Sequence, residues 1–356
     1  PIKSTYRIHQ ANFVACHNPS YVDKYNMVQE LVDGGTFLLN CPWDMEGLEK
    51  HLPGQVKAYI ANHNIKFYTI DGIKIGKEIG LGGRINTVLQ SAFFKLAEII
   101  PEEEAISLMK AAAKATYGRK GDKIVQMNYD AIDAGAKQVV EIEVPESWKD
   151  AADEGLAVPH IDENGRKDVI DFVKNIQTKV NAQEGNSLPV SAFTDYADGS
   201  TPSGSSAYEK RGIAVDIPIW QPDNCIQCNR CAYVCPHAVI RPVALTEEEA
   251  ANAPEGMQSI PMIGMPDMKF AITVSAYDCT GCGSCANVCP GKKGEKALVM
   301  GNMEENAGKQ TFFDYGREIP VKPEVVAKYK ETTVKGSQFK QPLLEFSGAC
   351  AGCGET

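Results

Sequence analysis

The chain has 356 residues, of which 43% are apolar, and a formal net charge of −10 at pH 7. This length predicts two or three domains with enough apolar residues for buried cores. The acidic balance argues against a nucleic-acid partner, which normally needs a basic face. No apolar run approaches ~18 residues, so neither a transmembrane helix nor a membrane partner is expected.

The chain starts at Pro1, with no initiator methionine and no apolar signal segment. Most of its twelve cysteines stand at metal-ligand spacings rather than at scattered positions. Thiols of this kind persist in a reducing compartment. We therefore expect a cytoplasmic location, in an organism that lives with little oxygen.

The first ~117 residues predict strands that alternate with helices. Strand-like runs occupy residues 11–16, 36–41 and 65–70, and helical spacing occupies residues 21–32, 45–60, 85–100 and 101–116. Strands separated by helices predict a parallel sheet with helical crossovers. Cys16 and Cys41 lie within apolar strands and are expected to be inert core thiols.

A glycine-rich stretch, residues 76–87, precedes the helix predicted at 85–100. It contains Gly82, Gly83, Arg84 and Asn86. A glycine turn that opens a helix can hold phosphate on its free backbone N–H groups. Glycines before a helix also serve simply as a connection, so both interpretations stay open.

The middle of the chain predicts a helix at residues 125–137 and a strand at 139–144. Residues 146–206 then become polar and broken, and residues 198–206 have the glycine, serine and proline content of a linker. This composition predicts a boundary before the next module, which residues 213–220 enter as a strand.

Two stretches, residues 225–236 and 279–290, share one cysteine spacing. Cysteines at i, i+3 and i+6 are followed by a fourth at i+10 and then by proline. This is the spacing of bacterial [4Fe-4S] proteins, in which the fourth cysteine ligates the other cluster. The predicted ligands are Cys225, Cys228, Cys231 and Cys289 for the first-run cluster, and Cys279, Cys282, Cys285 and Cys235 for the second-run cluster.

Other interpretations of these cysteines fit less well. Structural zinc usually takes two C-x2-C pairs, and cysteines three residues apart bridge poorly as disulfides. The stretch resembles a two-cluster bacterial ferredoxin, apart from a long insert at residues 241–272. We expect a short helix near Thr246 and an irregular loop in this insert.

The end of the chain holds a further C-x2-C pair, Cys350 and Cys353, with no cysteines left to complete four ligands. A half-built metal site, together with a start that lacks methionine, predicts that the sequence is a segment of a longer chain.

Several motifs in order resemble pyruvate:ferredoxin (flavodoxin) oxidoreductase. They are residues 40–44, 79–87, 90–94, the two cysteine runs and residues 347–356. The resemblance covers essentially the whole chain and matches the middle segment of the long single-chain enzyme. The fold class it implies is α/β plus α+β. Its domains are a coenzyme A-associated parallel α/β domain without its beginning (1–165), a small connecting domain or linker (166–206), a 2[4Fe-4S] ferredoxin-like domain (207–323) and the start of a thiamine diphosphate-binding domain (324–356).

The resemblance implies oxidative decarboxylation of pyruvate to acetyl-CoA and CO2, with electrons passed to ferredoxin or flavodoxin. The full-length chain would be a homodimer that uses thiamine diphosphate, Mg2+ and coenzyme A, and this segment alone would be inactive. No catalytic residue is assigned here. Cys350 and Cys353 match two of four ligands of a third cluster, and Glu355 would lie near thiamine diphosphate.

Two further sites are hypotheses. The turn with Gly82, Gly83, Arg84 and Asn86 would hold a coenzyme A phosphate. The loop that follows Cys289 carries Lys292, Lys293 and Lys296, and it would dock an acidic electron acceptor, because the acidic chain as a whole cannot attract one. The alternative for these lysines is a solvated turn that keeps the module soluble.

Two alternative functions remain. One is a stand-alone iron–sulfur electron carrier without catalysis of its own. The other is an oxidoreductase of the same kind that acts on 2-oxoglutarate or indolepyruvate. The order of the motifs favours pyruvate.

Overall fold

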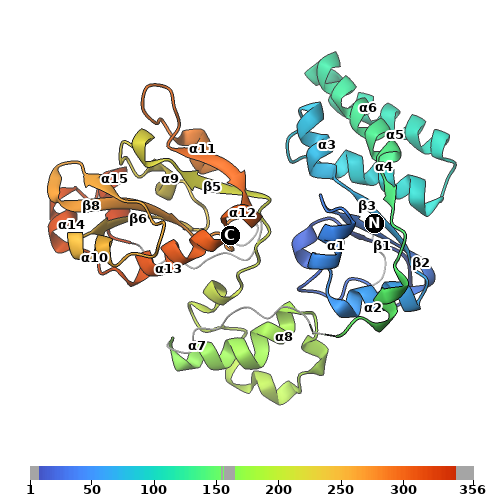
Figure 1. The fold of residues 1–356 in the computed structure, drawn as a ribbon, viewed down its shortest axis with the longest axis horizontal. Coiled ribbons are helices and arrows are strands. Elements are labelled where there is room, and N and C mark those ends of the chain that lie inside the picture. The colour runs from blue at the N-terminus through green and yellow to red at the C-terminus, as the bar shows by residue number, and fades with distance from the viewer. Residues whose placement is uncertain (1–7, 154, 156–164, 342–356) are drawn as a thin grey trace. The chain divides into compact units, whose positions relative to one another are not determined.

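The computed structural model describes residues 8–153, 155 and 165–341. The chain divides into two compact units, Pro1–Val158 and Pro159–Thr356 (Figure 1). Within the described part, no helix is both long and apolar enough to cross a membrane.

The first unit is built on a four-stranded sheet with the order β1-β2-β3-β4. Strands β1 (Ala11–Cys16), β2 (Leu31–Asn40) and β3 (Lys66–Ile70) are parallel, and the short β4 (Val140–Glu141) is antiparallel to β3. The three parallel strands agree with the predicted parallel α/β arrangement. The antiparallel edge strand β4 is an addition to it.

Helices cover both faces of this sheet. Phe37 and Leu39 belong to one apolar core with α1 (Met45–His51) and α2 (Gly54–Asn62). Leu38, which points to the opposite face, belongs to a second core with α3 (Gly72–Ile79), α4 (Asn86–Ala97) and α6 (Asp122–Lys137). Helix α5 (Glu102–Tyr117) lies antiparallel beside α6 (Figure 1). Burial on both faces explains the nearly continuous apolar run of β2.

The helix predicted at residues 21–32 is wrong. The structure has only a 3-10 turn at Pro19–Tyr21, and β2 already begins at Leu31. Val22, Val28 and Leu31 are buried, so their helical spacing reflects burial of an irregular segment. Gly34 and Gly35 lie inside β2. Ala11 pairs with Leu31 and Phe13 with Thr36, so the glycines belong to a bulge in β2.

Two other helix predictions need correction. The patch at residues 45–60 is two helices, because Pro53 forces the preceding Leu52 out of the helical region (ψ 127°). Helix α3 was missed, since its glycines lower helix propensity. One of them is required: a Cβ on Gly76 would stand 2.5 Å from the carbonyl oxygen of Gly82.

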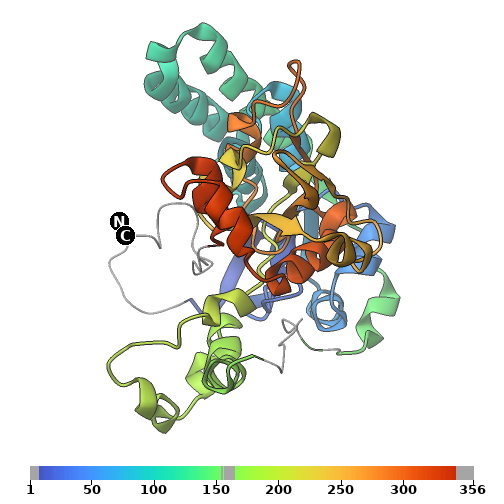
Figure 2. The ribbon, with the colours of Figure 1, turned by 90° about the vertical axis from the view of Figure 1, so that its left-hand side faces the viewer.

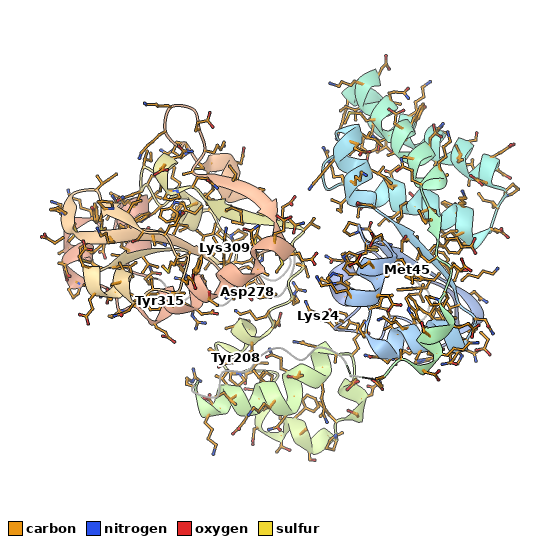
Figure 3. The ribbon with its side chains drawn as sticks, viewed as in Figure 1. Lys24, Met45, Tyr208, Asp278, Lys309 and Tyr315 are labelled. Atoms are coloured by element: carbon orange, nitrogen blue, oxygen red, sulfur yellow. The ribbon has the colours of Figure 1, made fainter. Side chains whose placement is uncertain are left out.

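The second unit opens with a continuous helical segment that the sequence pattern did not predict. Helix α7 (Lys167–Phe172) runs through a π-helical turn (Val173–Gln177) into α8 (Thr178–Asn181). Figure 2 shows this segment end-on. Its apolar face packs against Tyr196 and Tyr208, and Tyr208 is labelled in Figure 3. The polar composition around it concealed a small apolar core.

The cysteine runs lie in the rest of the second unit, where each run connects one antiparallel sheet to another. Strand β5 (Asp216–Trp220) pairs with β9 (Leu298–Asn302), and a second sheet has the order β6-β8-β7, from β6 (Ile240–Leu245), β8 (Met265–Val274) and β7 (Ile260–Met262). Helices α9 (Arg230–Tyr233) and α11 (Ser284–Val288) close the two runs and pack on each other.

The insert at residues 241–272 is more ordered than predicted. The short helix is confirmed as α10 (Glu247–Ala251), which begins with a capping box between Thr246 and Glu249. The irregular loop is wrong: β7 and β8 form a hairpin. Met262, Met268 and Phe270 of this hairpin are buried in the core that surrounds the cysteines.

Helices α12 (Met303–Asn306), α13 (Gln310–Glu318), α14 (Pro323–Lys328) and α15 (Val334–Phe339) follow β9. Val325 of α14 and Phe339 of α15 are buried in the same core as Phe270. This core therefore extends past the domain boundary predicted after residue 323.

Candidate iron–sulfur site

The two cysteine runs fold in the same way. In the first run, Gln227 and Asn229 have positive φ angles of 54° and 57°. At the corresponding positions of the second run, Gly281 and Gly283 have φ angles of 71° and 73°. Two left-handed residues in each run curl the chain so that its first three cysteines surround one centre.

The first predicted ligand set shares one cavity. Cys225, Cys228 and Cys231 line it together with Cys289 of the other run, and Trp220, Phe270 and Ile272 are among its apolar walls. The cavity is partly open to solvent. The structure thus brings the fourth cysteine of the second run to the first three cysteines of the first.

The second predicted set is brought together as well. Burial raises the pKa of Cys279 to about 12 and that of Cys285 to about 11, and the nearby sulfur of Cys235 contributes to both shifts. Cys282 also lies close enough to Cys235 to influence its pKa. The fourth cysteine of each run therefore lies beside the first three of the other.

Hydrogen-bond donors face the sulfur atoms. The backbone N–H of Gln227 donates to Cys225 Sγ (3.4 Å), and that of Gly281 donates to Cys279 Sγ (3.4 Å), at matching positions of the two runs. The N–H of Ala297 donates to Cys289 Sγ (3.3 Å). Such donors suit anionic sulfur and tune cluster potentials. The site therefore fits a thiolate-ligated cluster.

Bringing these buried thiols together is costly without iron. Burial raises the pKa of Cys231, and the neighbouring sulfurs of Cys225 and Cys228 raise it further. Bound iron offsets this cost because it stabilises thiolates directly. Among the described residues, no three potential ligands are spaced to hold a single metal ion. The thiolates of a cubane each bind a different iron, so they stand farther apart than the ligands of one zinc ion.

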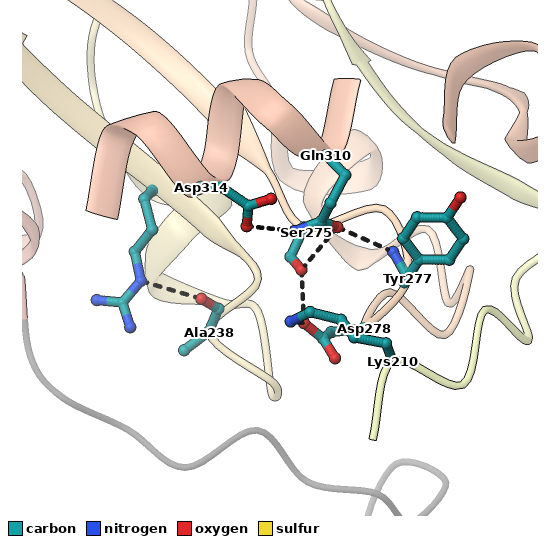
Figure 4. A network of polar contacts seen from close by, with 8 residues as sticks. Lys210, Ala238, Ser275, Tyr277, Asp278, Gln310 and Asp314 are labelled. Atoms are coloured by element: carbon teal, nitrogen blue, oxygen red, sulfur yellow. Dashed lines mark hydrogen bonds and ion pairs between the residues drawn. The ribbon is translucent and has the colours of Figure 1, made fainter. Parts of the chain in front are cut away.

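A polar network supports the second run (Figure 4). Asp278, which precedes Cys279, accepts hydrogen bonds from Lys210 and from Ser275 Oγ (2.5 Å). Gln310 of α13 accepts from Ser275 Oγ (3.1 Å) and from the N–H of Tyr277 (3.3 Å). No local pattern in the sequence identifies these residues, since only folding brings them together.

Two side-chain amides support the first run. Gln227 donates to the carbonyl oxygen of Pro261 (2.8 Å) and accepts from the N–H of Ile263 (2.8 Å), which ties the cysteine loop to the β7–β8 hairpin. Asn229 donates to the carbonyl oxygen of Lys335 (3.0 Å), which ties the loop to α15. Both amides were missed as well, because nothing local distinguishes them from other loop residues.

The cysteines predicted to be inert are confirmed as core residues. Cys16 is 1% exposed and Cys41 is 4% exposed. Burial raises the pKa of each thiol to about 12. Both thiols therefore stay protonated and unreactive at neutral pH.

The glycine turn lies in the first unit, immediately before α4. Gly82, Gly83, Arg84 and Asn86 are all exposed there, and α4 begins at Asn86 without a side-chain cap. Arg84 Nε donates to the carbonyl oxygen of Leu81 (3.1 Å). The four predicted residues thus form one exposed turn at a helix N-terminus.

The lysine loop is more structured than a solvated turn. Lys292 Nζ donates to the carbonyl oxygen of Asp223 (3.0 Å). Lys296 Nζ donates to the last carbonyls of α11, those of Ala286 (2.7 Å) and Asn287 (2.8 Å). Two of the three predicted docking lysines therefore hold the cysteine loops in place.

Cys350, Cys353 and Glu355 lie outside the described residues. The partial third cluster and the thiamine-proximal residue stay predictions.

The fold and the two interlocked cysteine sets define an iron–sulfur protein with a two-cluster, ferredoxin-like module. Family models agree along the chain. Residues 1–138 match pyruvate ferredoxin/flavodoxin oxidoreductase, residues 160–214 match a domain of unknown function, and residues 224–293 match a 4Fe-4S dicluster domain.

Curated relatives match the entire chain. It is 50% identical to the pyruvate:ferredoxin oxidoreductase of Moorella thermoacetica, 48% identical to the pyruvate-flavodoxin oxidoreductase of Enterobacter agglomerans and 44% identical to the pyruvate dehydrogenase [NADP(+)] of Cryptosporidium parvum. It spans 30%, 29% and 19% of their respective lengths. Over its whole length the chain is therefore similar to a segment of pyruvate:ferredoxin and pyruvate-flavodoxin oxidoreductases.

Proposed function

We propose that the chain is part of an enzyme that decarboxylates pyruvate oxidatively to acetyl-CoA and CO2, and that its cysteine module passes the electrons to ferredoxin or flavodoxin. The observation that carries this proposal is the pairing of each cysteine triplet with the fourth cysteine of the other run. The relatives that match the whole chain support the choice of reaction.

The two clusters would be held by the predicted sets, with Cys289 and Cys235 exchanged between the runs. Their chemistry is one-electron transfer, and a pair of clusters divides a long electron path into short hops. The protein's part is to exclude water, to donate hydrogen bonds to sulfur and to fix the distance between the two centres.

Thiamine diphosphate, Mg2+ and coenzyme A would supply the carbon chemistry in the longer, homodimeric protein. Thiamine diphosphate would bind to a domain that starts within residues 324–356, after the helices that share the core of the cysteine module, with Glu355 close to it. Cys350 and Cys353 would contribute to a third cluster.

A coenzyme A phosphate would bind at the glycine turn. The exposed backbone N–H groups that open α4 and the exposed guanidinium of Arg84 support this proposal. Each charge-assisted hydrogen bond is worth roughly 1.5–3 kcal/mol. In the full-length enzyme, Arg84→Ala should therefore raise the KM for coenzyme A about tenfold or more and leave the KM for pyruvate nearly unchanged. Equal effects on both would favour a simple connecting turn.

The function is tested by assaying the anaerobically purified full-length protein. We expect reduction of ferredoxin or flavodoxin that needs both pyruvate and coenzyme A, and slower reduction with 2-oxoglutarate or indolepyruvate. Faster turnover of another 2-oxoacid would correct the substrate. Reduction that occurs only with an external electron donor would favour the alternative, a stand-alone electron carrier.

A further inference from the structure

Helix α15 covers the first cysteine run. Asn229, which stands between Cys228 and Cys231, donates its side-chain amide to the backbone carbonyl of Lys335 (3.0 Å). Helices α9 and α15 are in contact as well. Lys335 is therefore fixed at its backbone to the loop that carries three of the first-run cysteines.

Three contacts prevent α15 from shifting. Thr333 caps it by accepting from the N–H of Gly336 (3.1 Å). A Cβ on Gly336 would stand only 2.1 Å from the carbonyl oxygen of Lys330, so the helix and the preceding loop are in direct backbone contact. Phe339 is 3% exposed and packs edge-on against Phe270. The position of Lys335 follows from this packing.

The side chain of Lys335 is fixed too. It is half-buried, and its Nζ lies 4.2 Å from the ring centroid of Tyr329. The hydroxyl of Tyr329 donates to the carbonyl oxygen of Ile263 in the β7–β8 turn. Within the part of the chain that the structure describes, Lys335 forms no ion pair with a carboxylate.

This ammonium lies within electrostatic reach of the first-run sulfurs. Burial lowers the pKa of Lys335, and the sulfur atoms of Cys228 and Cys225 oppose that shift. A half-buried cation that has no carboxylate partner is stabilised strongly by a nearby anion. A cluster ligated by four thiolates would be that anion.

We propose that the ammonium group of Lys335 is a fixed positive charge that raises the reduction potential of the first-run cluster. The inference rests on the proposed assignment of that cluster to Cys225, Cys228, Cys231 and Cys289. Reduction adds one electron to the cluster and neither forms nor breaks a bond. A fixed positive charge stabilises the reduced form, which carries one more negative charge.

The second-run set has a different pattern of charges. Asp278, which precedes Cys279, is paired with Lys210, so these two charges largely offset each other. Burial lowers the pKa of Arg241, and the sulfur of Cys235 opposes that shift, so Arg241 is the cation near the second-run set. Lys335 acts selectively because the sulfurs that influence it, those of Cys228 and Cys225, belong to the first-run set.

The test is a potentiometric titration with dithionite of the anaerobically purified full-length protein, followed by electron paramagnetic resonance. Lys335→Met should lower the midpoint potential of the first-run cluster alone, and Lys335→Arg should restore most of it. The matched control is Lys340→Met, since Lys340 is exposed near the end of α15 and paired with Glu331. Cys282→Ser identifies the second-run signal by perturbing it.

Iron analysis separates the possible failures. If Lys335→Met carries the parental iron content and the first-run potential does not move, or if both potentials move equally, the proposal is overturned. If Lys335→Met does not assemble, Lys335→Gln is titrated under the same criterion. Loss of first-run iron in both variants would show a purely structural lysine and would also overturn the proposal. Absence of clusters from the parent protein would instead overturn the proposed function.

Discussion

The two cysteine runs have one spacing and one backbone conformation, yet different side chains occupy the two left-handed positions. The second run has Gly281 and Gly283, which adopt positive φ angles without strain. The first has Gln227 and Asn229, which adopt them less readily but tether the loop to a hairpin and a helix. The ligand pattern is thus local, whereas the surroundings of each cluster come from distant parts of the chain.

The surroundings also differ in exposure and in charge. Cys225 is buried, and Lys335 lies near it. Cys282 of the second-run set is exposed, and Asp278 beside that run is paired with Lys210. A repeated motif has therefore been placed in two environments. Potentials of cubane clusters depend on hydrogen bonding, exposure and charge, so we expect the two clusters to differ in potential.

The largest effect should come from breaking the exchange of ligands between the runs. Cys235→Ser removes a thiolate that we assign to the second-run cluster, although Cys235 belongs to the first run in sequence. We expect loss or conversion of the second-run cluster and nearly intact first-run signals, as measured by iron content and electron paramagnetic resonance. If only the first-run signal changes, the assignment is wrong.

An intermediate effect should follow from exchanging the residues at the left-handed positions. Gly281→Ala introduces a Cβ at φ 71° and only 3.0 Å from the carbonyl oxygen of Asp216, which should cost about 1–3 kcal/mol. Gln227→Gly relieves a positive φ but removes two partly buried hydrogen bonds worth about 1 kcal/mol each.

We therefore expect Gly281→Ala to speed loss of the second-run cluster in the presence of a chelator. Gln227→Gly should change cluster loss little and should loosen the β7–β8 hairpin, as seen by faster amide exchange at Ile263. Slower cluster loss in Gly281→Ala than in the parent would contradict the proposed role of glycine at this position.

The sequence predicts the part of the site that depends on the spacing of residues close together in the chain. Eight cysteines at fixed offsets, followed by proline, indicate both clusters and their shared ligands. Lys335 could not be found in this way, because it lies more than 100 residues from Cys228 and is brought there only by the packing of α15. Gln310 and Lys210 reach the second run in the same non-local manner.

The fold shows the same limit. The strands of the first unit were recognised because apolar runs report burial directly. The predicted helix at residues 21–32 failed because buried residues in an irregular segment matched helical spacing by chance. Helix α3 was missed because its glycines serve close backbone contacts, such as that of Gly76 with Gly82, which no local pattern reveals.

The smallest expected effect concerns the lysine loop, which distinguishes the second run from the first at the surface. Reversing the charge of all three lysines would change the stability of the module as well as docking. Lys292 and Lys296 donate hydrogen bonds to backbone carbonyls of the cysteine loops, and the change would remove them. Lys293 is exposed, and no hydrogen bond or ion pair joins it to another described residue, so Lys293→Glu is the cleaner change. The matched control is Lys340→Glu, which reverses one exposed charge on the same unit.

At ~8 Å in water, reversal of one charge opposite a carboxylate costs about 1 kcal/mol. Lys293→Glu should therefore slow reduction of an acidic ferredoxin about fivefold at low salt, and much less at high salt, where exposed charges are screened over ~8–10 Å. Reduction of a small neutral dye should not change. An unchanged rate with ferredoxin at low salt would exclude this loop as the docking site, and an equal loss with the dye would show damage to the clusters themselves.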